Sequence, residues 1–109
     1  MAETNKVLGQ SDPLATTLTN IYTVPGATST IVSSIMVCNR SAIATAFRIS
    51  VAVAGAADST KQYLYYDIAI TGNNSFSAIL GLTLATTDVV RVYATLATLS
   101  FNIFGVEII

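Results

Sequence analysis

The residues that most often perform catalysis are few in this sequence and form no motif. The chain of 109 residues contains no histidine, which removes the usual general base, the usual partner of a serine nucleophile and the most frequent metal ligand. Asp58, Asp67 and Asp88 stand near turns and strand ends without a shared spacing, so they do not indicate a glycosidase-like pair of carboxylates. Nucleophile-elbow and glycine-rich phosphate-binding motifs do not occur. We therefore expect that the protein is not an enzyme and has no catalytic residues.

Metal and cofactor sites are not indicated either. Cys38 is the single cysteine of the chain, so it cannot form a disulfide within the chain or supply the paired spacing of a zinc site. We expect Cys38 to be a small buried hydrophobic side chain. The sequence thus predicts no metal site and no bound cofactor.

Three tyrosines close together are the strongest candidates for contacts with a ligand or a partner. They are Tyr63, Tyr65 and Tyr66. Tyrosine offers a large surface and one hydroxyl at low entropic cost, so exposed tyrosines stack on sugar rings and anchor interfaces. Alternate tyrosines on a strand are also common in cores. The sequence leaves both interpretations open, and we favour a core or subunit interface over a ligand platform.

Arginines supply the other directional groups. Arg40 stands in a predicted turn, whereas Arg48 and Arg91 stand on predicted strands, where we expect Asp67 to lie opposite one of them. A guanidinium group is well suited to the carboxylates of a partner. Ordinary solvated charge is the simpler account of each arginine, and Arg40 is included among the candidate interface residues.

Strands, not helices, must position these residues. In Thr30–Gly55, apolar residues recur at every second position on both sides of the polar break Asn39–Ser41. This period of two is typical of β-strands, and a helix would scatter the same residues. We therefore predict a strand–turn–strand hairpin in the middle of a β-sandwich.

Turn signals divide the remaining sequence into further strands. We expect strands over 14–24, 61–70, 76–84, 89–96 and 99–109. Asp88 is expected to cap the turn before its strand. The total of seven or eight strands predicts an all-β fold, either an antiparallel β-sandwich or a jelly roll. Residues 1–13 are predicted to be an extended N-terminal arm, and residues 14–109 a single domain.

The composition indicates a surface that is covered in an assembly. Charged residues make up 10% of the chain, against about 25% in an average soluble protein, and 52% of the residues are hydrophobic. No apolar run approaches the roughly 18 to 20 residues of a membrane-spanning helix, and residues 1–13 lack the features of a secretory signal. The net charge of −1 and the absence of a basic patch argue against nucleic acid. We expect a homo-oligomer with neither a membrane nor a nucleic acid as partner.

Both ends of the chain are candidate contacts with another subunit. Val7 and Leu8 form a short apolar patch in the predicted arm, and the sequence ends on Ile108 and Ile109. An arm of this kind can add a strand to a neighbour's sheet. The apolar C-terminal residues are expected to pack in the sheet or against another subunit.

Two long stretches and the closing strand carry a likeness to a known family. They read IYTVPGATSTIVSSIMVCNRS, YLYYDIAITGNNSFSAILGLTLATTDVVRVYA and LSFNIFGVEI, and they cover most of the chain after Pro13. They resemble the small β-sandwich virion proteins of tailed bacteriophages, including those of cyanophages. The resemblance implies a component of the virion, assembled in the cytoplasm of the bacterial host.

Within the particle, the resemblance favours a capsid decoration or cement protein. Such proteins often sit as trimers over the junctions between capsomers and fasten neighbouring copies of the major capsid protein. Small sandwiches of this kind also occur as tail, neck or fibre subunits. A receptor- or glycan-binding module that uses Tyr63, Tyr65 and Tyr66 is a further alternative.

Overall fold

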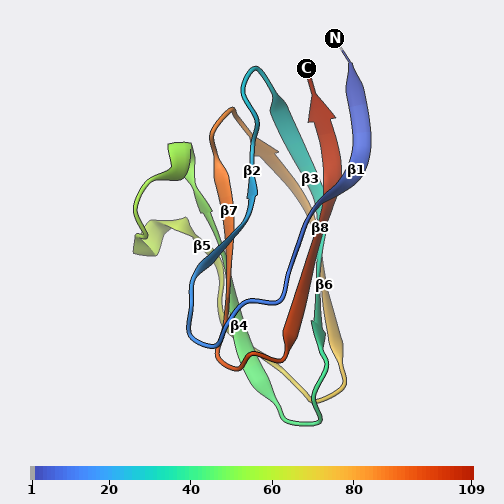
Figure 1. The fold of residues 1–109 in the computed structure, drawn as a ribbon, viewed down its shortest axis with the longest axis vertical. Coiled ribbons are helices and arrows are strands. Elements are labelled where there is room, and N and C mark those ends of the chain that lie inside the picture. Colours follow the sequence, from blue (N-terminus) through green and yellow to red (C-terminus); the bar gives the residue numbers. More distant parts are fainter. Residues whose placement is uncertain (1) are drawn as a thin grey trace.

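The protein consists of two four-stranded antiparallel β-sheets packed face to face (Figure 1). The structure is a computed structural model that describes residues 2–109; Met1 lies outside the described residues. Sheet A has the strand order β1-β8-β3-β6 and sheet B the order β2-β7-β4-β5. The strands are β1 (Glu3–Ser11), β2 (Thr19–Thr23), β3 (Ser29–Asn39), β4 (Thr45–Ala52), β5 (Tyr63–Ile70), β6 (Ser75–Leu84), β7 (Val89–Ala94) and β8 (Leu99–Ile108). The predicted all-β sandwich is confirmed.

Strand pairing is nested along the chain. Strand β1 pairs with β8, β2 with β7, β3 with β6 and β4 with β5, each antiparallel. The chain therefore follows the course of one long hairpin whose length is distributed over both sheets. Strand β8 also pairs with β3, and β7 with β4, which completes each sheet.

The core lies between the inner faces of the two sheets and has Phe47 near its centre. The Phe47 ring is fully buried and lies 5.2 Å from the ring of Phe76 and 6.1 Å from that of Phe101, measured between centroids. Tilted and edge-on arrangements of this kind suit the quadrupoles of aromatic rings. Aliphatic residues of β3, β7 and β8 fill the space around them.

The segment predicted as an N-terminal arm is a strand of the domain's own sheet over its described part. Residues 3–11 form β1, which pairs with β8 from Glu3 to Ser11. Of the predicted arm, only Asp12 and Pro13 lie beyond β1, in the connection to β2. The first strand after it is shorter than expected, since it occupies Thr19–Thr23 instead of residues 14–24.

The predicted hairpin over Thr30–Gly55 is wrong in its pairing. Strands β3 and β4 are both central, as expected, but they belong to different sheets. Asn39 redirects the chain: its amide nitrogen donates to the carbonyl oxygens of Ile43 (2.8 Å) and Thr71 (3.2 Å), and its side-chain oxygen accepts from the backbone of Ser41 (3.1 Å). Residues 39–41 thus form a turn, but one that carries the chain across the sandwich. Alternation alone cannot distinguish such a crossing from a hairpin.

A bulge in β3 changes which residues face the core. The register with both neighbouring strands shifts between Val32 and Ser34. An extra residue in a strand reverses the inward and outward positions that follow it. Ile31 consequently faces solvent while Ile35 is fully buried, although regular alternation, as predicted for this stretch, would place both residues on one face.

Candidate interaction surfaces

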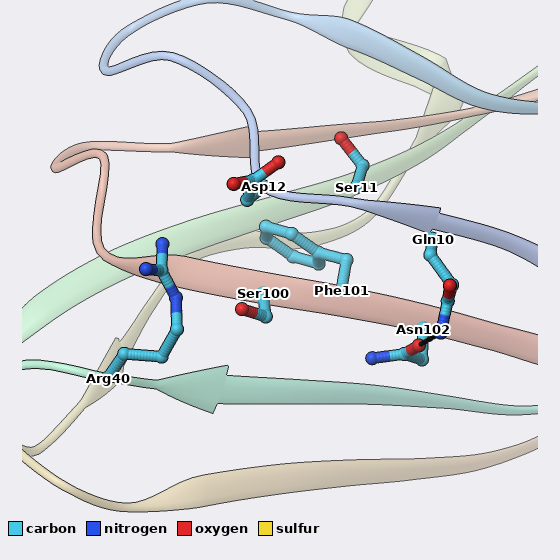
Figure 2. Close-up of a pocket in the computed structure, with 7 residues that line it drawn as sticks. All are labelled: Gln10, Ser11, Asp12, Arg40, Ser100, Phe101 and Asn102. Atoms are coloured by element: carbon cyan, nitrogen blue, oxygen red, sulfur yellow. Dashed lines mark hydrogen bonds between the residues drawn. The ribbon is translucent and has the colours of Figure 1, made fainter.

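One hollow lies at the end of sheet A where β1 ends, β8 begins and β3 ends (Figure 2). It has a volume of about 370 Å³ and is lined by Gln10, Ser11, Asp12, Arg40, Ser100, Phe101 and Asn102. The Gln10 amide donates to Asn102 at 2.7 Å, so these two side chains hold each other on adjacent strands. The hollow thus offers amides, hydroxyls and one charge of each sign, a set suited to polar contacts with a peptide segment.

Arg40 lies beside this hollow and is partly engaged within the chain. Its guanidinium group donates to the carbonyl oxygen of Ala97 at 3.2 Å, and its backbone amide donates to that of Thr98 at 2.9 Å. In the view of Figure 2, the Arg40 guanidinium group and the Asp12 carboxylate both lie above Ser100. Because no ion pair between them is found among residues 2–109, both charges remain available to a partner.

Two irregularities in β5 bring Tyr63 and Tyr66 to the outer face of sheet B. Residues three apart on a regular strand point to opposite faces, but the register of β5 against β4 shifts twice between Tyr63 and Ile68. Asp67 takes a φ of 53° at the second shift. The rings of Tyr63 and Tyr66 therefore meet edge-on, with centroids 5.1 Å apart and an interplanar angle of 89°.

Arg48 lies next to Tyr63 and Tyr66 and is held by hydrogen bonds and ring contacts. Its Nε and Nη2 atoms donate to the two carboxylate oxygens of Asp67, at 2.7 and 3.3 Å. Its guanidinium carbon lies 4.1 Å from the ring centroid of Tyr66 and 4.3 Å from that of Tyr93. The hydrogen bond to Asp67 raises the pKa of Arg48 above its ordinary value. The expectation that Asp67 lies opposite Arg48 or Arg91 is confirmed for Arg48.

The three candidate tyrosines separate into two environments. Tyr65 points inward, where its ring lies 5.5 Å from that of Phe76, whereas Tyr66 is 56% exposed. Tyr63 and Tyr66 line a second hollow together with Thr60. Burial, and then the neighbouring Asp58 carboxylate, raise the pKa of Tyr63. A ligand platform on this face would therefore use Tyr63 and Tyr66 but not Tyr65.

The outer face of sheet A is apolar and carries almost no charge. Ile31, Met36 and Ile79 are exposed there, and the partly buried Phe104 and Val106 of β8 lie beside them. Phe104 is level with Val7 of β1 and, through Ser34, with Ile79 of β6. Strands β3 and β6 contain no charged residue. This surface therefore differs from an ordinary solvated sheet face, on which charged and polar side chains alternate with the buried ones.

Cys38 belongs to the same outer face and is exposed. The expectation that it is buried is therefore wrong. The position follows from the bulge in β3, after which Ile35, Val37 and Asn39 turn inward and the alternate residues turn outward.

The chain ends lie side by side, on adjacent strands of sheet A (Figure 1). Ala2 and Ile109 exchange two backbone hydrogen bonds, of 3.1 and 2.9 Å. Val7 is 47% exposed and Ile109 is 68% exposed, whereas Leu8 and Ile108 are partly buried. Leu8 packs against the core, so Val7 is the residue of this pair that remains free for a partner.

A network of polar groups closes the sandwich near these ends. The Tyr22 hydroxyl donates to Glu107 at 2.6 Å and lies 2.8 Å from the Thr30 hydroxyl, and Lys6 donates to the other carboxylate oxygen at 3.0 Å. Burial and the Glu107 carboxylate raise the pKa of Tyr22 to about 12. The hydrogen bonds from Tyr22 and Lys6 lower the pKa of Glu107. The network ties β1, β2, β3 and β8 together.

No protein-family model, curated protein or solved structure matches this chain. Within residues 2–109, no group of three or more histidine, cysteine, aspartate or glutamate side chains is placed to hold a metal ion. The helical turns in the same part of the chain are too short to cross a membrane.

The structure does not gather the predicted interface residues in one place. Arg40 lies at one end of sheet A, Val7 and the C-terminal isoleucines lie along it, and Tyr63 and Tyr66 lie on sheet B. Sequence reasoning missed the outer face of sheet A because its members come from β3, β6 and β8. The sequence contains one sign of this face: β3 and β6 contain no charged residue. Strands with one solvent-exposed face usually alternate apolar with polar residues.

Proposed function

We propose that the protein is a non-enzymatic structural component of a tailed-bacteriophage virion, and more narrowly a capsid decoration or cement protein. Its partner is the major capsid protein, its own assembly is a homo-oligomer, most simply a trimer, and it is assembled in the cytoplasm of the bacterial host. The family resemblance supplies the setting. The observation that carries the proposal is the outer face of sheet A, which is largely apolar and carries almost no charge.

That face suits a binding role because it cannot be well solvated. Isolated exposed hydrophobic residues are normal, but a contiguous group rimmed by polar residues marks an interaction site. Ile31, Met36 and Ile79 are joined by Phe104 and Val106 across neighbouring strands. A cement protein binds the assembled shell and not its separate parts, so the free energy of this contact adds directly to the stability of the shell.

The strand connectivity is compatible with this setting. The nested pairing of β1 with β8, β2 with β7, β3 with β6 and β4 with β5 supports the jelly-roll alternative, an architecture found in viral capsid proteins and also in lectins and cupins. Because the architecture serves several functions, the surface and not the fold carries the argument.

The test is binding to empty shells of the major capsid protein. Met36→Lys, which places a charge in the middle of the face, should abolish co-sedimentation with shells and remove the protein's effect on their melting temperature. Leu64→Lys is the matched control, because Leu64 is similarly exposed but lies on β5 of sheet B. Unchanged binding of Met36→Lys, or an equal loss with Leu64→Lys, would refute the proposal.

The exposed Tyr66 favours a second candidate, a receptor- or glycan-binding module of a tail or fibre. Tyr66 and Tyr63 line a hollow with Thr60, and an exposed tyrosine ring can stack on a sugar. Under this alternative, the double substitution Tyr63→Ala and Tyr66→Ala lowers adsorption of particles to cells and leaves shell stability unchanged. Under the capsid proposal, the same variant adsorbs normally.

A further inference from the structure

Four strands form the lateral edges of the two sheets, and three of them are protected against pairing with another chain. Natural proteins protect edges with charges, bulges or short strands. Strand β1 carries Glu3 and Lys6 and a bulge at Leu8. Strand β2 has five residues and an irregularity, and β5 has two irregularities and Asp67.

The fourth edge, β6, has one irregularity, which lies beyond Ile79, and the half of the strand before it has no such protection. It is ten residues long and contains neither a charge nor a proline. Its first five residues, Ser75–Ile79, pair with β3 in unbroken register. Among residues 2–109, no backbone hydrogen bond other than those of the β3 ladder reaches β6. The Ser75 amide donates to the side-chain oxygen of Asn74 at 2.8 Å, a contact that an incoming strand would have to replace. The outward backbone groups of Phe76–Ile79 have no such partner and form a template for another strand.

The core is also less enclosed on the side of β6. Of the hydrophobic residues that pack on the core while remaining partly exposed, most belong to the two edge strands on this side: Tyr65 and Ile68 of β5 and Phe76, Leu80 and Leu82 of β6. On the opposite side, β1 passes so close to β2 that a Cβ atom on Gly9 would overlap the Ile21 carbonyl oxygen. An added strand at β6 would cover apolar surface that the monomer leaves accessible.

We infer that β6 pairs with β6 of a second copy of this chain, antiparallel about a twofold axis at Ser77. In this register Phe76 lies opposite the partner's Ala78 on the inner face. Ile79 lies opposite the partner's Ser75 on the outer face. Each large side chain meets a small one, and no like charges are brought together.

The contact is isologous, since the same strand serves both copies. It joins the two sheets A into one continuous sheet of eight strands. The β6 contact also doubles the oligomer to which the chain otherwise belongs. A monomer becomes a dimer, and a trimer becomes a hexamer. The inference is independent of the proposed function, because it requires no shell protein.

The experiment places charges at the axis. Ser77 is exposed, so Ser77→Lys leaves the fold intact but sets two lysines directly opposite each other. We expect the native mass, measured by light scattering at micromolar concentration, to fall to half that of the wild type. Thr83→Lys is the matched control, because Thr83 is exposed on the same strand and face but lies outside the paired segment. Its mass should equal that of the wild type.

A charge exchange identifies the axis itself. Ser77→Glu alone should also halve the mass, and a mixture of Ser77→Lys with Ser77→Glu should restore it. Circular dichroism of each variant checks the fold. The inference is overturned if the wild type has the same mass as Ser77→Lys, if Thr83→Lys lowers the mass equally, or if the mixture fails to restore it.

Discussion

Gly105 is a core position at which the addition of a single methyl group should be costly. It lies in β8, between the bulge of β1 at Leu8 and the bulge of β3 that follows Val32. A Cβ atom at this position would lie 2.9 Å from Cδ1 of Leu8, 3.0 Å from the Cα atom of Val32 and much closer to the Ile31 carbonyl oxygen than van der Waals contact allows. Two of these three obstacles are backbone atoms of a central strand.

The loss of stability caused by Gly105→Ala depends on which neighbours must move to admit the methyl group. Leu8 can change rotamer, but the backbone of β3 can yield only if its bulge shifts, and that bulge decides which residues of β3 face the core. Inserting an extra methyl group into a packed site costs about 1–3 kcal/mol. The rigid obstacle places Gly105→Ala at the upper end, so we expect a loss of about 3 kcal/mol in the free energy of unfolding.

Urea unfolding followed by tyrosine fluorescence measures this change. Gly81→Ala provides the control, because a Cβ atom at Gly81 of β6 meets no atom within 4 Å. The same substitution there should leave stability unchanged or raise it by about 0.5–1 kcal/mol, since alanine restricts the unfolded chain more than glycine does. A Gly105→Ala variant within about 0.5 kcal/mol of the wild type, the usual effect of a surface substitution, would refute the reasoning.

Four further predictions concern the core, the ion pair of Arg48 with Asp67, and the contributions of Glu107 and Tyr22 to the pH dependence of stability. Phe47→Ala should lower the free energy of unfolding by about 4 kcal/mol, since it empties the centre of the core; calorimetry checks this. Arg48→Met should cost about 1 kcal/mol, and Asp67→Asn should cost less in the Arg48→Met background than in the wild type, as a double-mutant cycle would show. Because the folded pKa of Glu107 is lowered, its contribution is present above the unfolded value of 4.5 and is lost as pH falls through the folded pKa; the stability difference between wild type and Glu107→Gln should therefore shrink in acid. Because the folded pKa of Tyr22 is raised from 10.0 to about 12, its contribution is full below pH 10 and declines as pH rises towards 12, and Tyr22→Phe should lack this decline in urea titrations at alkaline pH.

The fold class could be predicted because alternation and turn residues are local signals. Thr71–Asn74 and Ala85–Asp88 end strands where expected, and Asp88 caps its turn by accepting the backbone amide of Ala85 at 2.9 Å. Sheet membership could not be predicted, because the residues after Asn39 are equally suited to a hairpin and to a crossing. Distant partners hold the chain in the crossing, among them the Thr71 carbonyl, which accepts from the Asn39 side chain, and the Thr98 carbonyl, which accepts from the Arg40 amide.

The candidate surfaces depended on features that alternation does not reveal. Tyr63 and Tyr66 share a face because β5 contains two irregularities, and Ile31 is exposed because β3 contains a bulge. A bulge adds one residue to a strand and has no characteristic amino-acid composition, so the sequence gives little sign of its position. Ser33 and Ser34 are the available hint, since two small polar residues interrupt an otherwise apolar strand.

The two outer faces of the sandwich differ in how their polar groups are ion-paired or hydrogen-bonded. Binding measured at several salt concentrations can use this difference to distinguish the candidate functions. On sheet B, Arg48 is neutralised by Asp67 and stacked between two tyrosines, and Arg91 donates to Asn20 and to the Gly55 carbonyl oxygen. On sheet A, the face contains little charge to pair, so the association that we propose for it would rest on apolar burial and backbone pairing. Salt screens charge–charge contacts but not apolar burial. Shell binding through sheet A should therefore persist, or strengthen in sulfate, as ionic strength rises. If binding instead weakens steeply with added sodium chloride, the charged end of sheet A, where Arg40 and Asp12 lie, carries the contact in place of the apolar face.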